Sequence, residues 1–351
     1  MIDSVDRTGA LGTFRSPQDW ASAQINLGSA WAQSSTGDST SNLRRAIACF
    51  EAAMSVFTEQ AYPRQWAMIQ NNLANAWADL STGDPAENLR NAFDYYDAAL
   101  RVFFEKEHPR EWARIQYNRA SIWVQLPTCD RTTNLNSAIG CYEAALRVYS
   151  EHESPQEWAA VQNNLGNVWL EFATGDREAN LTNAIGCYEA ALRVYSEQHT
   201  PLDWARVVRN LGNTWLELTA GDRAANLDKA IACYTAALRV YTEQEFPDYR
   251  AFVERHLQQA WQDLDNQPGV HRVRPTNNFD GGHLQKTESP ETTPSASAAT
   301  DSTDSNETIL NGVRFVTTSG QGPISWLQPG FGGLKGIPSC DSLSNQGDAL
   351  H

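Results

Sequence analysis

Residues 158–169 read WAAVQNNLGNVW, and close relatives of this stretch recur along the first three quarters of the chain at an interval of 46 residues. Eleven of the twelve tryptophans fall on two columns with this spacing. The columns are Trp31, Trp77, Trp123, Trp169, Trp215 and Trp261, and Trp20, Trp66, Trp112, Trp158 and Trp204. Self-similarity at such a period is typical of stacked repeats, in which each unit contacts its neighbours.

The quoted stretch has the apolar spacing of one helix, the first of each unit. Its apolar positions share one side at 100° per residue, and they predict a core face made of Trp158, Val161, Leu165, Val168, Trp169 and Phe172. We expect Trp169 to be almost fully buried there. The opposite side is predicted to be an exposed working face with Ala160, Asn163, Asn167 and Glu171, and with Asn164 at its margin.

Each unit carries start and stop signals for two helices. Ser154-Pro155 places a hydroxyl at the N-cap and proline at the first helical position, and Ser16-Pro17 repeats the pattern. The first helix is expected to end at a Gly-Asp pair such as Gly175-Asp176, where glycine adopts a left-handed conformation and aspartate caps the next helix. In the third unit Cys129-Asp130 replaces this pair, so a less regular turn is expected there.

The second helix of each unit carries two further sequence features. Glu143 with Arg147 and Glu189 with Arg193 have the i, i+4 spacing of ion pairs on an exposed face. Four cysteines fall on one column, which predicts small packing residues too far apart for disulfides or a shared metal. The array ends on an unpaired helix near residues 247–264, one face of which has become polar, as a terminal cap requires.

Four segments follow from these patterns. Residues 1–15 are expected to form a flexible lead, residues 16–265 the repeat array, and residues 266–308 a disordered linker rich in Ser, Thr and Pro. Residues 309–351 combine glycine with large apolar side chains and could hold one short strand at Val313–Thr317. This tail is either a docking segment that orders on a partner or simply disordered.

Composition and motifs exclude several classes of function. A formal net charge of -15 argues against nucleic-acid binding, which depends on neutralising phosphates. There is no apolar run long enough for a membrane helix and no signal-peptide core, so a cytoplasmic protein is expected. A phosphate loop, a His-Glu-x-x-His motif and a Cys-x-x-Cys motif are all missing. The sequence therefore predicts no enzymatic activity, no cofactor and no metal.

The unit resembles a tetratricopeptide repeat. The residues that match this family's core positions are Leu165, Gly166 and Trp169 in the first helix, Ala184, Tyr188 and Ala191 in the second, and the closing Pro201. The period of 46 residues exceeds that of the family's usual repeat and is similar to that of its long-repeat branch, which includes kinesin light chains. The third unit departs from the pattern, because Arg119 stands in the column of Leu165.

The resemblance implies an all-α, right-handed superhelical solenoid whose first helices line a concave groove that binds extended peptides. The positions that match peptide-contacting residues are Asn26, Asn72, Asn118, Asn164 and Asn210 in one column and Asn75, Asn167 and Asn213 one turn on, with Asn163 beside them. An amide can both donate to and accept from a peptide backbone. Alternatively, the first column bonds to the neighbouring helix and holds the stack together.

Charged residues on the working face suggest that the groove has a basic and an acidic edge. The basic edge would comprise Arg114, Arg206, Arg209 and Arg255, and the acidic edge Asp79, Glu171 and Glu217. Both placements oppose the helix macrodipole, although they could also be ordinary solvated charges.

These observations predict a protein interaction scaffold whose partner is a peptide or another protein. Two alternatives remain open. The chain could be a self-inhibited switch with its own tail in the groove, or it could be the recognition arm of a separately encoded enzyme.

Overall fold

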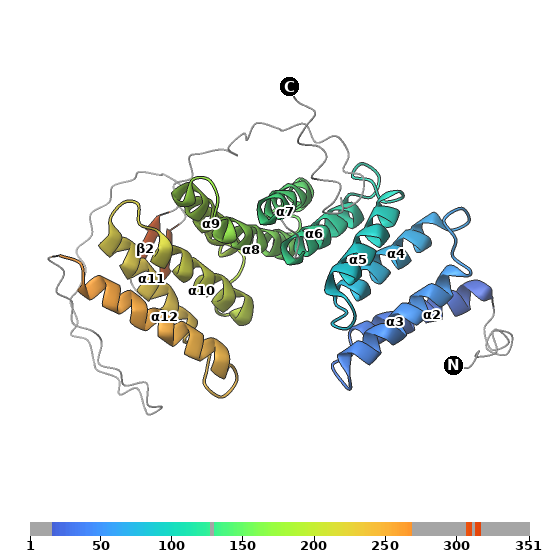
Figure 1. The fold of residues 1–351 in the computed structure, drawn as a ribbon, viewed down its shortest axis with the longest axis horizontal. Helices are drawn as coiled ribbons and strands as arrows, with labels where there is room; N and C mark the ends of the chain where they lie inside the picture. The colour runs from blue at the N-terminus through green and yellow to red at the C-terminus, as the bar shows by residue number, and fades with distance from the viewer. Residues whose placement is uncertain (1–15, 127–129, 269–306, 311–312, 317–351) are drawn as a thin grey trace, which may run out of the picture. The chain divides into compact units, whose positions relative to one another are not determined.

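The computed structural model describes residues 16–126, 130–268, 307–310 and 313–316. Within these ranges the chain forms helices that pack in sequential pairs, so it is a helical repeat protein of the all-α class (Figure 1). The first helices of the pairs, called A helices here, are α2 (Pro17–Ala32), α4 (Pro63–Ala78), α6 (Pro109–Gln125), α8 (Pro155–Glu171), α10 (Pro201–Glu217) and α12 (Pro247–Asp265). The B helices are α3 (Ser39–Met54), α5 (Pro85–Leu100), α7 (Arg131–Leu146), α9 (Arg177–Ala191) and α11 (Arg223–Ala237).

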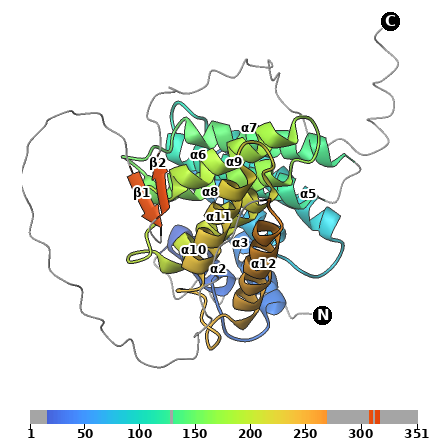
Figure 2. The same ribbon diagram turned by 90° about the vertical axis from the view of Figure 1, so that its left-hand side faces the viewer.

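The helices belong to two compact units. The larger contains α2 to α9 and the smaller contains α10 to α12 and a hairpin. The hairpin pairs β1 (Glu307–Leu310) with β2 (Val313–Val316) in antiparallel register (Figure 2). The strand predicted at Val313–Thr317 is thus confirmed as β2, and its partner spans the boundary predicted between the linker and the tail. The predicted lead at 1–15 and most of the linker and tail lie outside the described residues.

The turns between A and B helices follow the predicted Gly-Asp chemistry. Gly175 has a φ of 79°, and the side chain of Asp176 accepts a hydrogen bond from the backbone N–H of Ala179 at 3.1 Å. Asp130 caps α7 in the same way through Thr133 N at 3.1 Å, although the residues just before it lie outside the described part of the chain. Because only glycine takes a positive φ without a steric cost, this pair of residues sets the geometry of the turn.

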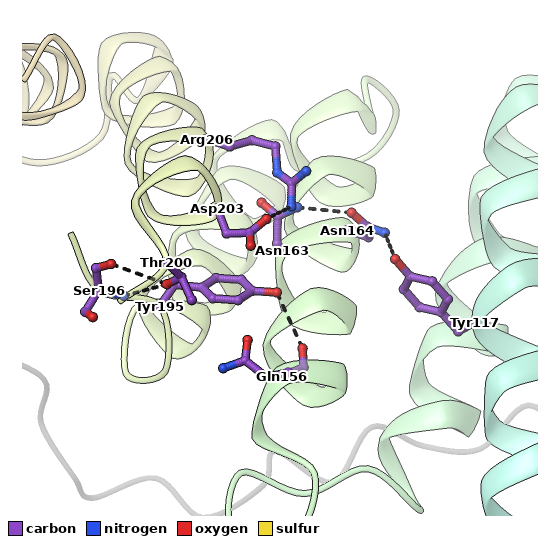
Figure 3. A network of polar contacts seen from close by, with 9 residues as sticks. All are labelled: Tyr117, Gln156, Asn163, Asn164, Tyr195, Ser196, Thr200, Asp203 and Arg206. Carbon is purple, nitrogen blue, oxygen red and sulfur yellow. Dashed lines mark hydrogen bonds and ion pairs between the residues drawn. The ribbon is translucent and has the colours of Figure 1, made fainter. Parts of the chain in front are cut away.

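The starts of the A helices agree with the prediction only in part. Ser16 caps α2 by accepting from Asp19 N at 3.1 Å. The hydroxyl of Ser154 makes no such cap, because it accepts from the backbone N–H of Ser150 at 3.1 Å. Thr200 repeats this arrangement with Ser196 N at 3.0 Å (Figure 3). At these positions the hydroxyl oxygen bonds to the backbone of the loop that precedes the helix. This bond takes the place of a cap on the first turn of the helix.

A column of buried asparagines at the start of every B helix closes each A–B turn. In the larger unit Asn88 donates to the carbonyls of Leu80 and Thr82, both at 2.9 Å. Its equivalents are Asn42, Asn134, Asn180 and Asn226, each buried and each donating to a carbonyl of its own turn. These amides satisfy carbonyls that the end of the A helix leaves without partners. Sequence analysis missed this column, although its 46-residue spacing was visible.

The predicted core face of α8 is largely confirmed. Val161, Leu165 and Val168 are at most 6% exposed, and Trp158 is 9% exposed. The expectation that Trp169 is almost fully buried is wrong, because it is only half-buried and its ring lies 5.9 Å from the equally half-buried Phe172. The residue is near the end of α8, where packing against the partner helix gives way to the turn.

Ion pairs between successive repeats replace the predicted pairs within one helix. Arg147, expected to bind Glu143, instead makes a bidentate contact at 2.8 Å with Glu105, in the loop between α5 and α6. Its guanidinium lies 5.0 Å from the centroid of the Trp112 ring. Arg193 binds Glu151 in the same way. Planar stacking and two parallel hydrogen bonds make arginine suited to this position.

We expect Glu105→Gln to lower the free energy of unfolding by up to about 1 kcal/mol at pH 7, the scale of an exposed ion pair. The hydrogen bond from Arg147 lowers the pKa of Glu105 below that of an ordinary glutamate carboxyl. A carboxyl whose pKa is depressed by folding stabilises the protein above its unfolded pKa and loses that contribution as the pH falls through its folded pKa. The difference between wild type and variant should therefore shrink below about pH 4.5. Urea unfolding at several pH values measures it, and a pH-independent difference would contradict the ion-pair explanation.

Candidate groove on the inner face

The A helices form the inner face of the larger unit. α2, α4, α6 and α8 contact one another in sequence, in addition to the contacts between each B helix and the A helix that follows it. Because consecutive B helices are not in comparable contact, the stack is tighter on its A side. The side of this unit on which the A helices meet is therefore called its inner face below.

A pocket of about 450 Å³ lies on this face, across three consecutive A helices. Its lining comprises Met68 of α4, Arg110, Glu111 and Arg114 of α6, Tyr149, Glu153 and Ser154 of the loop between α7 and α8, and Pro155, Gln156 and Glu157 of α8. A second pocket of about 400 Å³ shares Arg110, Tyr149, Glu153 and Ser154 with it and extends to Glu105 and Arg147. The two together form the candidate groove.

The groove combines an exposed apolar side chain with charges of both signs. Met68 is 45% exposed, which is high for so large an apolar residue. Arg114, the one predicted arginine in the pocket, is exposed beside it. The hydroxyl of buried Tyr149 donates to the carbonyl of Arg110 at 3.5 Å, and burial raises the pKa of Tyr149. An apolar anchor among charged groups suits a polypeptide ligand better than a small apolar one.

Two members of the first predicted asparagine column join neighbouring A helices. Asn118 of α6 donates to Asn75 Oδ1 of α4 at 3.0 Å, and Asn164 of α8 donates to the hydroxyl of Tyr117 in α6 at 2.9 Å (Figure 3). Asn164 Oδ1 also accepts from Asn163 Nδ2 at 3.0 Å. The alternative in which this column holds the stack together is therefore correct for Asn118 and Asn164.

Two asparagines predicted on the working face are buried instead. Asn163 is 2% exposed and Asn210 is 7% exposed. The prediction treated each A helix as packed on one side only, whereas α8 contacts both α7 and α9 as well as α6. These neighbours leave only a narrow exposed stripe on an A helix. Among the other members of the first column, Asn26 is exposed and Asn72 is half-buried, with its Oδ1 3.4 Å from Asn71 Nδ2.

The second predicted column lies on that stripe and bonds to buried tyrosines of the B helices. Asn167 is exposed and its Oδ1 accepts from the Tyr188 hydroxyl at 2.7 Å. In the smaller unit Asn213 accepts from Tyr234 at 2.8 Å. Asn75 accepts from Tyr96 in the same manner. An alanine in this column would therefore remove one hydrogen bond from a buried hydroxyl, so each amide also contributes to stability.

The remaining predicted charges make contacts of several kinds within their own units. In the smaller unit Arg209 packs over Tyr249 and Phe252, with its guanidinium 5.4 and 5.6 Å from the ring centroids. Arg206 pairs with Asp203 at 2.7 Å, whereas Arg255 is exposed.

In the larger unit Glu171 forms an ion pair with Arg131 of the preceding B helix. The structure shows contacts for some of the charges in these predicted edges. Most of those contacts join two helices.

The third repeat carries a polar contact where the others are apolar. Arg119 occupies the column of Leu73 and Leu165, and it pairs with Asp97 of α5 at 3.1 Å. The Arg119 side chain is 13% exposed and its Nε has no hydrogen-bond partner in the part of the chain that the structure describes. Burial raises the pKa of Asp97 although Arg119 acts to lower it. Together with the Asn75–Asn118 bond, this pair makes the interface between the second and third repeats unusually polar.

Possible metal ligands and cysteine thiols bear on the chemistry of the described ranges. Within them no cluster of His, Cys, Asp and Glu side chains has an arrangement that could hold a metal ion. Burial raises the pKa of Cys141 to about 11 and that of Cys187 to about 12, which keeps both as thiols at neutral pH. A search of the same ranges for a helix with the length and apolarity needed to cross a membrane found none.

Comparison with protein-family models found no match, and comparison with curated proteins found none either. The fold therefore defines the class of this protein, which is a repeat protein built from stacked helix pairs.

We expect Asp97→Ala to destabilise the chain by about 1 to 2 kcal/mol, because it leaves the Arg119 side chain, only 13% exposed, without the partly solvated carboxylate that it pairs with. The double variant Arg119→Leu with Asp97→Ala should be at least as stable as wild type, since apolar packing commonly replaces a buried ion pair without loss. Urea unfolding of the wild type, both single variants and the double variant measures the coupling. A double variant as unstable as Asp97→Ala alone would show that the pair does not act through its charges.

Proposed function

We propose that the chain is a protein interaction scaffold that binds an extended peptide segment of a partner along the inner face of its A helices. The observation that carries the proposal is the pocket across α4, α6 and α8, where Met68 and Arg114 are exposed. Stacked helix pairs present such concave surfaces through neighbouring repeats, and each repeat can contact a different part of a long ligand.

The resemblance to tetratricopeptide repeats supports the same proposal. Leu165 and Gly166 of α8 and Tyr188 of α9, which carry the resemblance, are all buried in the interface of the helix pair. They act in packing, so they define how the surface is built rather than what it binds. We propose on the same grounds that the chain has no enzymatic activity of its own, and that its partner is a protein or peptide in the cytoplasm.

The proposal is tested by panning a displayed peptide library on the immobilised full chain and measuring the affinity of a synthetic peptide that is enriched. We expect the double variant Met68→Ala with Arg114→Ala to weaken this affinity at least about tenfold, since one side-chain contact with a charged group accounts for about 1.4 kcal/mol. Fluorescence polarisation with the labelled peptide gives the dissociation constants.

A matched control removes an exposed arginine from the B side. Arg90 of α5 has a half-exposed side chain and pairs with Asp84 at 3.9 Å. Arg90→Ala should bind the peptide as tightly as wild type. Equal affinities for the groove variant and the wild type would place the binding site elsewhere.

A further inference from the structure

The outer face of a B helix is the side turned away from the A helix of its own pair. Gly186 of α9 lies two residues before Tyr188, which is fully buried. Two residues along a helix are about 200° apart, so Gly186 is on the outer face, where it is exposed. The column to which it belongs comprises Ala48, Asp94, Gly140, Gly186 and Ala232.

Gly140 and Gly186 have no packing role within the described part of the chain. A Cβ added at either position would meet nothing within 4 Å beyond the backbone of its own helix. Both residues are in the interior of a helix, where glycine is less favourable than alanine. Glycine on an outer helix face allows another segment to approach the backbone closely. The two residues therefore indicate a surface that a ligand contacts.

Small uncharged residues precede both glycines by one helical turn. They are Asn136 and Ser137 in α7, and Thr182 and Asn183 in α9, with the acidic Glu143 and Glu189 at the edge of each stripe. Three other B helices carry charges at the equivalent positions. These charges are Arg44 and Arg45 in α3, Arg90 in α5, and Asp228 and Lys229 in α11. A ligand on α7 or α9 thus displaces water from fewer charged groups.

α11 shows what such a face can hold. Besides α10 and α12, the helix contacts strand β1 of the hairpin. The outermost residues of α11 are also well covered, since Ala232 is 6% exposed and Ala236 is fully buried, whereas Gly186 in the column of Ala232 is exposed. A two-stranded hairpin is at best marginally stable alone and gains stability by packing against a helix. The outer face of a B helix is therefore a surface on which this hairpin packs.

We propose that the outer faces of α7 and α9 bind the hairpin β1–β2 of a second copy of the chain. The hairpin on α11 of the smaller unit is the observation that identifies the occupant. The described chain has one hairpin and three outer faces with glycine or alanine in this column, α7, α9 and α11. On α7 and α9 a strand can come closer than on α11, because glycine replaces Ala232 and no charge must be desolvated at the positions of Asp228 and Lys229.

This surface is separate from the candidate groove. The groove is lined by A helices and the loops before them, whereas Gly140 and Gly186 are on B helices. The inference therefore does not depend on the proposed function, and each can fail without the other.

The first experiment measures binding of a labelled synthetic peptide of residues 305–318 to the full chain by fluorescence polarisation. We expect the double variant Gly140→Arg with Gly186→Arg to weaken its affinity at least about tenfold, because a strand packed over either position would bury an unpaired charge. Ala48→Arg is the matched control, since it places the same side chain in the same column of α3, and it should bind as wild type does. Failure of the peptide to bind wild type, or equal affinity for the double variant, would contradict the proposed surface.

Gly140→Ala with Gly186→Ala separates binding from folding. This variant should unfold at a higher urea concentration than wild type, because alanine is the better helix former and the added methyl groups meet nothing in the free protein. The same methyl groups should weaken peptide affinity at least about fivefold, the effect of overpacking a close contact. A variant that is more stable and binds normally would show that the strand does not pack over the glycines.

Sedimentation equilibrium of the full chain over a range of concentrations tests whether the occupant is a second copy. The mean mass should rise with concentration for wild type and for Ala48→Arg, and should stay at that of one chain for Gly140→Arg with Gly186→Arg. Met68→Ala with Arg114→Ala should leave the rise unchanged, because the groove is a different surface. A single-chain mass for wild type at every concentration would overturn the proposal even if the free peptide binds.

Discussion

The packing of each helix pair depends on how closely an aromatic ring of the B helix approaches the backbone of the A helix. A Cβ added at Gly166 would lie 2.7 Å from Cε1 of Tyr188, and one added at Gly212 would lie 2.9 Å from the same atom of Tyr234. Atoms of real side chains do not approach so closely, so these positions require glycine for their spacing. The ring lies against the glycine, and its hydroxyl reaches the next residue of the A helix, Asn167 or Asn213. The same ring therefore packs against the A helix and bonds to the side chain of Asn167 or Asn213.

Two repeats use alanine in place of this glycine, Ala74 and Ala120, and both are fully buried. They flank the interface at which the stack is most polar. There Arg119 pairs with Asp97, and Asn118 bonds to Asn75, whereas the repeat that follows has buried Leu165 in the same column. Buried ion pairs add little net stability, because desolvation offsets the attraction between the charges. They do, however, penalise any other register of the two helices.

Asparagine serves three separate purposes in this chain. At the start of the B helices it closes turns, as Asn88 does with Leu80 and Thr82. Between A helices it joins repeats, as Asn164 does with Tyr117. On the exposed stripe it meets a buried tyrosine and faces solvent, as Asn167 does. A single residue type suits all three because its amide carries a donor and an acceptor on one short, rigid group.

The sequence by itself determined the repeat, because the 46-residue spacing and the helical periodicity are visible in the order of residues alone. Each helix must bury one apolar side, and this requirement produces the periodicity. It also determined the Gly-Asp turns, where φ near 80° excludes most other residues. Only the tertiary structure decided which asparagines face solvent, because Asn163 and Asn164 are adjacent in sequence and their roles depend on which of three neighbouring helices each one meets. Nor could sequence assign Arg147 to Glu105, since a partner 42 residues away competes with one only four residues away, and which of them an arginine binds depends on the packing of successive repeats.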